Sequence, residues 1–348
     1  MRAMSTPVPI RSRSAALALA GGALASLWVV QPVAAHGIAP VDPPTALTLA
    51  LDWSFEPLVL VPLLLIALGW IWLIRRVDAA HPLTPVPRLR AASFILGLFA
   101  IAVALQSGIS RYDTSLFSIH MVQHLLLTLL APPLLALGAP ITLLLRASTP
   151  AVRHRWILPV LHSRVVRVAA HPVVGWLAFA GVMWGTHFSA LFNASLDNVA
   201  IHDFEHVLYL TAGLLFWWPV IGVDPSPYRM SHPVRVLYVF LQMPQNSFLA
   251  VAILGAPAPL YAHYVTLIRA WGPNPLVDQQ LAAGIMWLAG DLAFLAAILA
   301  LVAGWARHDE RTTVAQERRA DAELAAIRER EGRLAERLAA ERAEGGRG

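Results

Sequence analysis

The chain has no cysteine and no lysine among its 348 residues. The missing cysteine excludes disulfides, thiolate metal ligands and cysteine redox chemistry, so a bound metal must use histidine, methionine, carboxylate or amide ligands. Charged residues are also scarce, at 14%, against 57% hydrophobic residues. The net charge of +5 comes from arginines that lie mostly in loops and in the C-terminal tail. There they orient helices and do not indicate nucleic-acid binding.

Long apolar runs are abundant instead. Several approach twenty residues, the length with which a helix crosses a bilayer, and no long stretch has the mixed polarity of a soluble domain. The sequence therefore predicts an all-α fold, a polytopic transmembrane helix bundle, in a membrane domain over residues 36–306. Its seven membrane helices are expected at about 57–74, 91–109, 118–138, 172–191, 205–222, 234–254 and 281–304.

The first 35 residues have the pattern of a signal peptide. Three arginines precede an apolar run over 15–30, and a small-residue cleavage site ends at Ala35. The alternative is an uncleaved first hydrophobic helix. Cleavage would leave His36 as the N-terminus, where its amine and imidazole could chelate a metal; otherwise His36 is an ordinary residue of an exported segment.

Arginines gather in alternate loops. They lie between the first and second, the third and fourth, and the fifth and sixth segments, whereas the other loops hold only Arg111 and Arg269. By the positive-inside rule, the N-terminus is outside and the C-terminus is cytoplasmic. Residues 307–348 then form a charged cytoplasmic tail, predicted to be a solvated helix, with self-association through a short coiled coil as the alternative.

Histidines mark the external ends of the expected helices. Two pairs are four residues apart, His120/His124 and His202/His206, and this spacing places both imidazoles of a pair on one helix face. Ionisable groups at membrane depth are costly, which favours a functional site. The expected metal ligands are His120, His124, His187, His202, His206, His263, Glu205 and, if exposed, His36.

Carboxylates accompany the second pair. One of them could orient an imidazole through its second ring nitrogen, as is usual around metal-bound histidine. Alternatively, Asp203 caps the fifth segment and Glu205 lies near the positive end of the helix dipole. Asp291, within the seventh segment, is interpreted as hydrogen-bonded to a polar residue of the sixth, with an ion route as the alternative.

Other features have structural interpretations. The proline-containing sequences at 132–133 and 138–140 are expected to bend or end the third segment. The methionines of the membrane segments are widely separated in the sequence and are interpreted as packing residues, with copper ligation as the less favoured alternative: Met121, Met183, Met243 and Met286. No nucleophile elbow, phosphate loop, zincin motif or dinucleotide fingerprint is present, so no enzyme activity is expected.

Four motifs occur in order along the chain: HMVQHLLLTLLAPPLLALGAP, HFSALFNASLDNVAIHDFEHVLYLTAGLLFWWPVIG, MPQNSFLAVAILGAPAPLYAHY and DQQLAAGIMWLAGDLAF. Over residues 50–305 the chain resembles the CtaG-type cytochrome c oxidase assembly factors. The resemblance implies a seven-helix protein of the bacterial inner membrane that helps to mature a haem-copper oxidase of the caa3 kind at copper insertion. Its partners would be oxidase subunits and membrane lipid. A single-helix copper chaperone of the same name uses cysteines, which excludes this chain.

Two other functions remain open from the residues alone. Histidines on facing helices could clamp a b-type haem in an electron carrier. A metal-ion or proton transporter would need polar residues across the bilayer, for which Asp291, Gln106 and Gln242 offer a thin route. The external histidines suit copper or zinc. Copper is the principal hypothesis, because a cysteine-free, histidine-rich site on the exported side fits copper slightly better than zinc.

Overall fold

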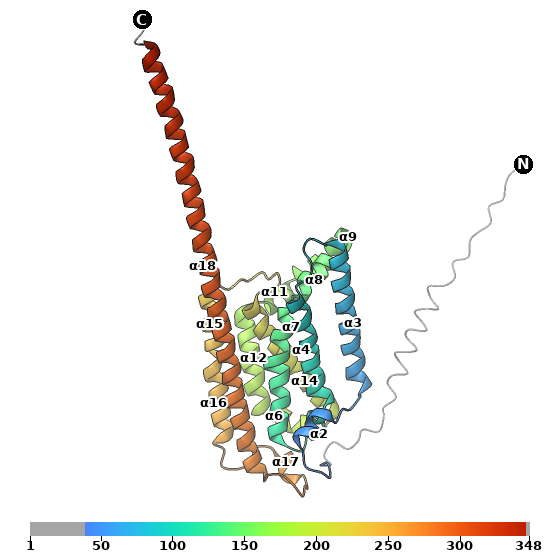
Figure 1. The fold of residues 1–348 in the computed structure, drawn as a ribbon. Helices are drawn as coiled ribbons and strands as arrows, with labels where there is room; N and C mark the ends of the chain where they lie inside the picture. Colours follow the sequence, from blue (N-terminus) through green and yellow to red (C-terminus); the bar gives the residue numbers. More distant parts are fainter. Residues whose placement is uncertain (1–38, 346–348) are drawn as a thin grey trace, which may run out of the picture. The chain divides into compact units, whose positions relative to one another are not determined.

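The computed structural model of the chain describes residues 39–345, and the regular structure in this part is entirely helical (Figure 1). The described helices belong to one compact unit, Gly37–Gly348. The expected signal sequence and His36 lie outside the described residues. The all-α prediction is confirmed for the residues described.

Six stretches of helix are long and apolar enough to cross a membrane. They are α3 (Pro57–Ala80), α4 (Arg88–Gln106) with α5 (Gly108–Tyr112), the third span 117–147, α14 (Val199–Ile221), α15 (His232–Phe240) with α16 (Gln242–Leu254), and α18 (Pro275–Gly345). A seventh results only if α12 (Pro172–His187) and α13 (Ala190–Asp197), bent by 71°, count as one span. The seven predicted segments all lie on these helices.

Short helices complete the described chain. α2 (Ala46–Leu51) precedes the first span and α17 (Ala262–Thr266) precedes the last. Between the third span and α12 lie α9 (Pro150–Val152), the π-helical η3 (Arg153–Ile157), α10 (Leu158–Leu161) and α11 (Arg164–Ala169).

Proline shapes the third span, as predicted. This span runs from α6 (Phe117–Leu125) through the π-helical η2 (Leu126–Leu130) and α7 (Ala131–Leu137) to α8 (Pro140–Ala147). The carbonyl of Thr128 has neither an i+4 nor an i+5 backbone donor, because both positions are proline. The indole Nε1 of Trp217 donates to it instead, at 3.0 Å. Ala139, in the left-handed conformation with φ of 57°, then separates α7 from α8.

α14 packs closely against its neighbours through glycine. A Cβ on Gly213 would lie 2.7 Å from Cγ of Pro132, and one on Gly175 would lie 2.3 Å from the carbonyl oxygen of Leu215. The Leu215 carbonyl lacks its helical donor because residue 219 is proline. Glycine therefore lets α12 and α7 approach α14 more closely than any larger residue would allow.

The bundle has two ends (Figure 1). We call the end formed by the connections 106–117, 187–199 and 254–275 the histidine end, and the opposite end, with connections 80–88, 138–172 and 221–232, the arginine end. α18 continues beyond the arginine end, and its described side chains are exposed from Trp305 to Leu334. This exposure agrees with the predicted solvated helix; self-association of the tail stays a prediction.

Candidate metal centre

The start of α14 sets the position of the second histidine pair. Asn198 caps the helix, since its side-chain oxygen accepts from the backbone N–H groups of Ala200 and Ile201 at 3.0 and 3.2 Å. The alternative in which Asp203 is the cap is therefore wrong. Because Asn198 already supplies an N-cap oxygen, α14 begins at Val199, six residues before the expected boundary. His202 and His206 consequently lie one turn apart within regular helix.

The start of α6 sets the first pair. The carboxylate of Asp278 on α18 accepts from the N–H of Phe117 at 2.6 Å and from the hydroxyl of Ser118 at 2.6 Å. A carboxylate at a helix N-terminus satisfies donors that have no partner within the helix. This contact fixes α6 against α18 and holds His120 and His124 at a defined depth.

The structure brings the two predicted pairs together. Ring centroids are 4.2 Å apart within the first pair and 4.3 Å apart within the second. Across the two helices, the rings of His120 and His202 are stacked with centroids 5.3 Å apart. All four histidines are buried.

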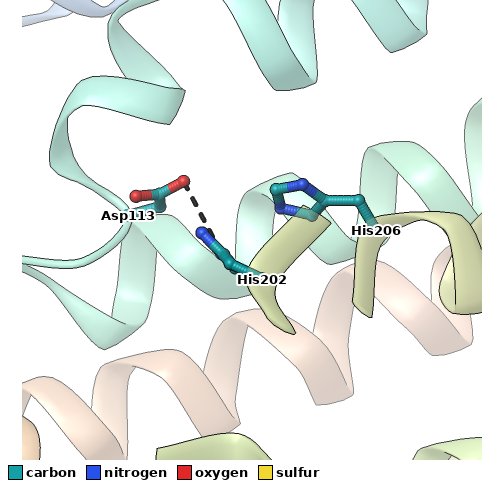
Figure 2. Close-up of side chains that lie close together, drawn as sticks. All are labelled: Asp113, His202 and His206. Carbon is teal, nitrogen blue, oxygen red and sulfur yellow. Dashed lines mark ion pairs between the residues drawn. The ribbon is translucent and has the colours of Figure 1, made fainter. Parts of the chain in front are cut away.

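Two buried carboxylates complete what we call the histidine cluster, which comprises Asp113, His120, His124, His202, Glu205 and His206. Oε2 of Glu205 lies 3.9 Å from Nε2 of His120 and 4.0 Å from Nε2 of His124. Oδ2 of Asp113 lies 4.0 Å from Nε2 of His202 (Figure 2).

Two groups of three within the cluster have ligand atoms within 4.8 Å of one another. The first is Asp113, His202 and His206, drawn in Figure 2; the second is His120, His202 and Glu205. His202 belongs to both. Two ligand atoms that are each about 2.1 Å from one ion lie at most about 4.2 Å apart. The separations of 3.9–4.0 Å between histidine nitrogens and carboxylate oxygens are too long for hydrogen bonds. They do lie within the limit of about 4.2 Å for two ligands of one ion.

Asp113 was not among the residues predicted from the sequence. Its carboxylate accepts from Nε2 of Gln123 at 2.8 Å, and Oε1 of the same amide accepts from Nε2 of His206 at 3.1 Å. Gln123 thus orients two cluster members at once. Burial raises the pKa of the Asp113 carboxyl to about 8. The available sequence signal was an acidic residue at the external end of an apolar segment.

Unpartnered polar atoms test whether these residues suit a metal. Both ring nitrogens of His120 and of His124, and both oxygens of Glu205, are buried without a hydrogen-bond partner of normal geometry among the described residues. A buried polar group without a partner is costly, by about 1–3 kcal/mol. A cation held by these atoms would remove that cost, so the donor set fits a metal ion.

His187 and His263 lie outside both groups. Nδ1 of His187 donates to the carbonyl of Met183 at 2.7 Å, and its ring centroid is 6.3 Å from that of His124. His263 is engaged through both nitrogens, with Nδ1 2.7 Å from Oδ1 of Asp197 and Nε2 2.9 Å from the carbonyl of Thr114. The structure therefore brings His187 to the edge of the cluster and keeps the ring of His263 apart from it.

Asp291 is hydrogen-bonded to α16, as the structural interpretation predicted. Its two oxygens accept from Nδ2 of Asn246 at 3.1 Å and from the hydroxyl of Ser247 at 2.8 Å. These contacts join α16 to α18. They give Asp291 a packing role that needs no ion route.

Comparisons with known proteins agree with the fold and the motifs. A family model for the cytochrome c oxidase caa3 assembly factor matches residues 68–308. Similar curated proteins include uncharacterized proteins of Mycobacterium leprae, Mycobacterium bovis and Mycobacterium tuberculosis, each 31% identical over 291 residues, or 82% of this chain. The chain spans only 44% of the length of these relatives. No solved structure matches the chain.

The family match covers well over half of the chain and includes His187 and the four histidines of the cluster: His120, His124, His202 and His206. It also includes His263, Glu205 and Asp113. With apolar helices that could cross a membrane, this chain belongs to the family of cytochrome c oxidase caa3 assembly factors.

Proposed function

We propose that the chain serves the assembly of a haem-copper oxidase by binding copper at the histidine cluster and delivering it to an oxidase subunit. The observation that carries the proposal is the meeting of two histidine pairs and two carboxylates in one buried cluster. In a family of oxidase assembly factors, a buried site rich in imidazole is suited to a metal cargo. The role is that of an assembly factor and not of an enzyme.

The packing of the rings favours a bare ion over haem. The imidazoles of His120 and His202, which come from different helices, are stacked with centroids 5.3 Å apart. A haem clamped between two helices needs its macrocycle between the two axial ligands. Stacked rings at this separation leave no gap for one, whereas an ion fits between donor atoms 3.9–4.0 Å apart.

The shared ligand favours delivery over permanent storage. A structural metal site is a closed set of four ligands. Here five donor residues form two groups that share His202, so an ion can exchange one ligand while others hold it. Such a site suits a metal that must later be released to a partner.

The arginines favour an external position for this site. The arginine end would face the cytoplasm by the positive-inside rule, which places the histidine end at the external face of the inner membrane. The client would then receive copper at that face, and the partner would be an oxidase subunit within the same membrane.

Metal analysis of the detergent-purified protein tests the binding step. We expect copper in the wild type, loss of copper in His120→Ala/His202→Ala, and no Soret band in either. His154→Ala is the matched control, because His154 is exposed at the arginine end. A Soret band that is present in the wild type and lost in the double variant would show that the site binds haem and not copper. A folded wild type that binds neither copper nor haem would refute the binding site.

Complementation tests the assembly step. In cells that lack the gene, the wild-type chain and His154→Ala should restore oxidase activity and the copper content of the oxidase. His120→Ala/His202→Ala should leave the oxidase short of copper. Full restoration by the double variant would show that assembly does not depend on the cluster.

A further inference from the structure

A small cavity lies beside the histidine cluster, toward the middle of the bundle. Its volume is about 30 Å³, and it is lined by three methionines from three helices: Met121 of α6, Met183 of α12 and Met286 of α18. From the sequence, where these methionines are far apart, packing was favoured over copper ligation. The fold gathers three of them at one cavity, whereas Met243 packs against the same apolar cluster as Met183 without lining the cavity.

Two histidines of the predicted ligand set also line this cavity, His124 and His187. Nδ1 of His187 donates to a backbone carbonyl, which leaves Nε2 as the acceptor nitrogen of the ring. That Nε2, and both ring nitrogens of His124, are buried without a hydrogen-bond partner among the described residues. Buried polar atoms normally have a hydrogen-bond partner, so apolar packing around the methionines does not account for unpartnered imidazole nitrogens at the cavity.

The lining also constrains the charge of any occupant. None of the residues that line the cavity is a carboxylate; most are Leu, Met, Phe or Trp, and the polar ones include the amides Gln242, Gln245 and Asn246. The Born cost of burying an ion grows with the square of its charge, so a cavity without a carboxylate disfavours a divalent ion far more than a monovalent one. The adjacent histidine cluster, in contrast, has Asp113 and Glu205 to compensate a divalent charge.

We propose that this methionine cavity holds monovalent copper, Cu(I), with ligands drawn from the thioethers of Met121, Met183 and Met286 and the imidazoles of His124 and His187. Soft thioethers select Cu(I), and imidazole accepts it as well. The inference deepens the proposed function and rests on it for the identity of the metal. It adds an oxidation state and a second position for the ion, which enters and leaves this cavity as Cu(I).

X-ray absorption at the copper edge tests the proposal on the full chain loaded with Cu(I) without oxygen. Because the protein has no cysteine, a sulfur neighbour of copper can only be methionine. We expect sulfur scattering in the wild type, its loss in Met121→Leu/Met183→Leu/Met286→Leu, and its retention in the control Met243→Leu. Leucine conserves the volume of methionine closely, so the cavity walls are kept.

Selenomethionine incorporation provides a second measurement that needs no substitution. A copper neighbour at the selenium edge of the loaded protein is expected, and its absence together with purely nitrogen and oxygen scattering at copper would overturn the cavity site. In that outcome the histidine cluster would remain the only binding position and the proposed function would stand. If the folded protein bound no copper at all, both the cavity site and the proposed function would fail.

Discussion

At the scale of single residues, His202 has a special position because it belongs to both ligand groups. Its removal leaves neither group with three ligands. We expect His202→Ala to lower copper affinity on the order of 100-fold or more, as measured by competition with a chelator. His263→Ala is the contrasting variant, since both nitrogens of His263 contact acceptors away from the cluster. Equal losses in the two variants would contradict the proposed ligand groups.

Glu205 differs from the histidines in bringing a negative charge. Glu205→Gln keeps the size of the side chain and one oxygen but removes the charge that offsets a buried cation. The variant should bind divalent copper or zinc at least about tenfold more weakly, which corresponds to about 1.4 kcal/mol. Its affinity for Cu(I) should change less. Isothermal titration with each ion compares the two affinities. A larger loss of affinity for Cu(I) than for the divalent ions would contradict the proposal that Cu(I) binds in the methionine cavity and not beside Glu205.

The sequence predicts some members of the site better than others. Spacing of four residues places two histidines on one helix face, so the pairs His120/His124 and His202/His206 were predictable. Asp113 and the methionine cavity were not, because their relation to the histidines depends on how four helices pack. No local pattern records that Met121, Met183 and Met286 face one space.

At the scale of the helices, the Thr128 carbonyl of the third span lacks a backbone donor, and the Trp217 indole of α14 donates to it instead. Trp217→Phe removes the indole N–H that donates to the Thr128 carbonyl and should lower the free energy of unfolding by about 1–3 kcal/mol. Pro132→Ala restores an i+4 backbone donor, so the same tryptophan change should cost less in that background. Reversible denaturation in mixed micelles measures both steps. Equal costs in the two backgrounds would mean that the indole acts through packing alone.

Helix positions were largely predictable, while helix breaks were only partly so. Apolar length gives the spans, and proline gives the interruption of the third. The bend between α12 and α13 has no proline or charge at the break. Ser189 lies at the break, where its hydroxyl accepts from the N–H of Leu191 and caps the new helix. A serine of this kind is too common in membrane helices to predict a 71° bend.

At the scale of the whole molecule, the absence of cysteine makes the orientation directly measurable. Ala258→Cys lies in an exposed loop of the histidine end, and Ala80→Cys is exposed at the arginine end. On intact cells, a membrane-impermeant maleimide should label the first variant and not the second. The reverse pattern would place the histidine cluster at the cytoplasmic face and contradict delivery of copper from outside.

His263 joins three segments of the histidine end. From the connection after α16 it contacts Thr114, in the connection after α5, and Asp197, at the end of α13, so segments far apart in the sequence meet there. The Asp197 side chain is exposed, whereas the His263 ring is buried. A client protein that bound Asp197 would therefore break one of these contacts and loosen the histidine end without touching a proposed metal ligand.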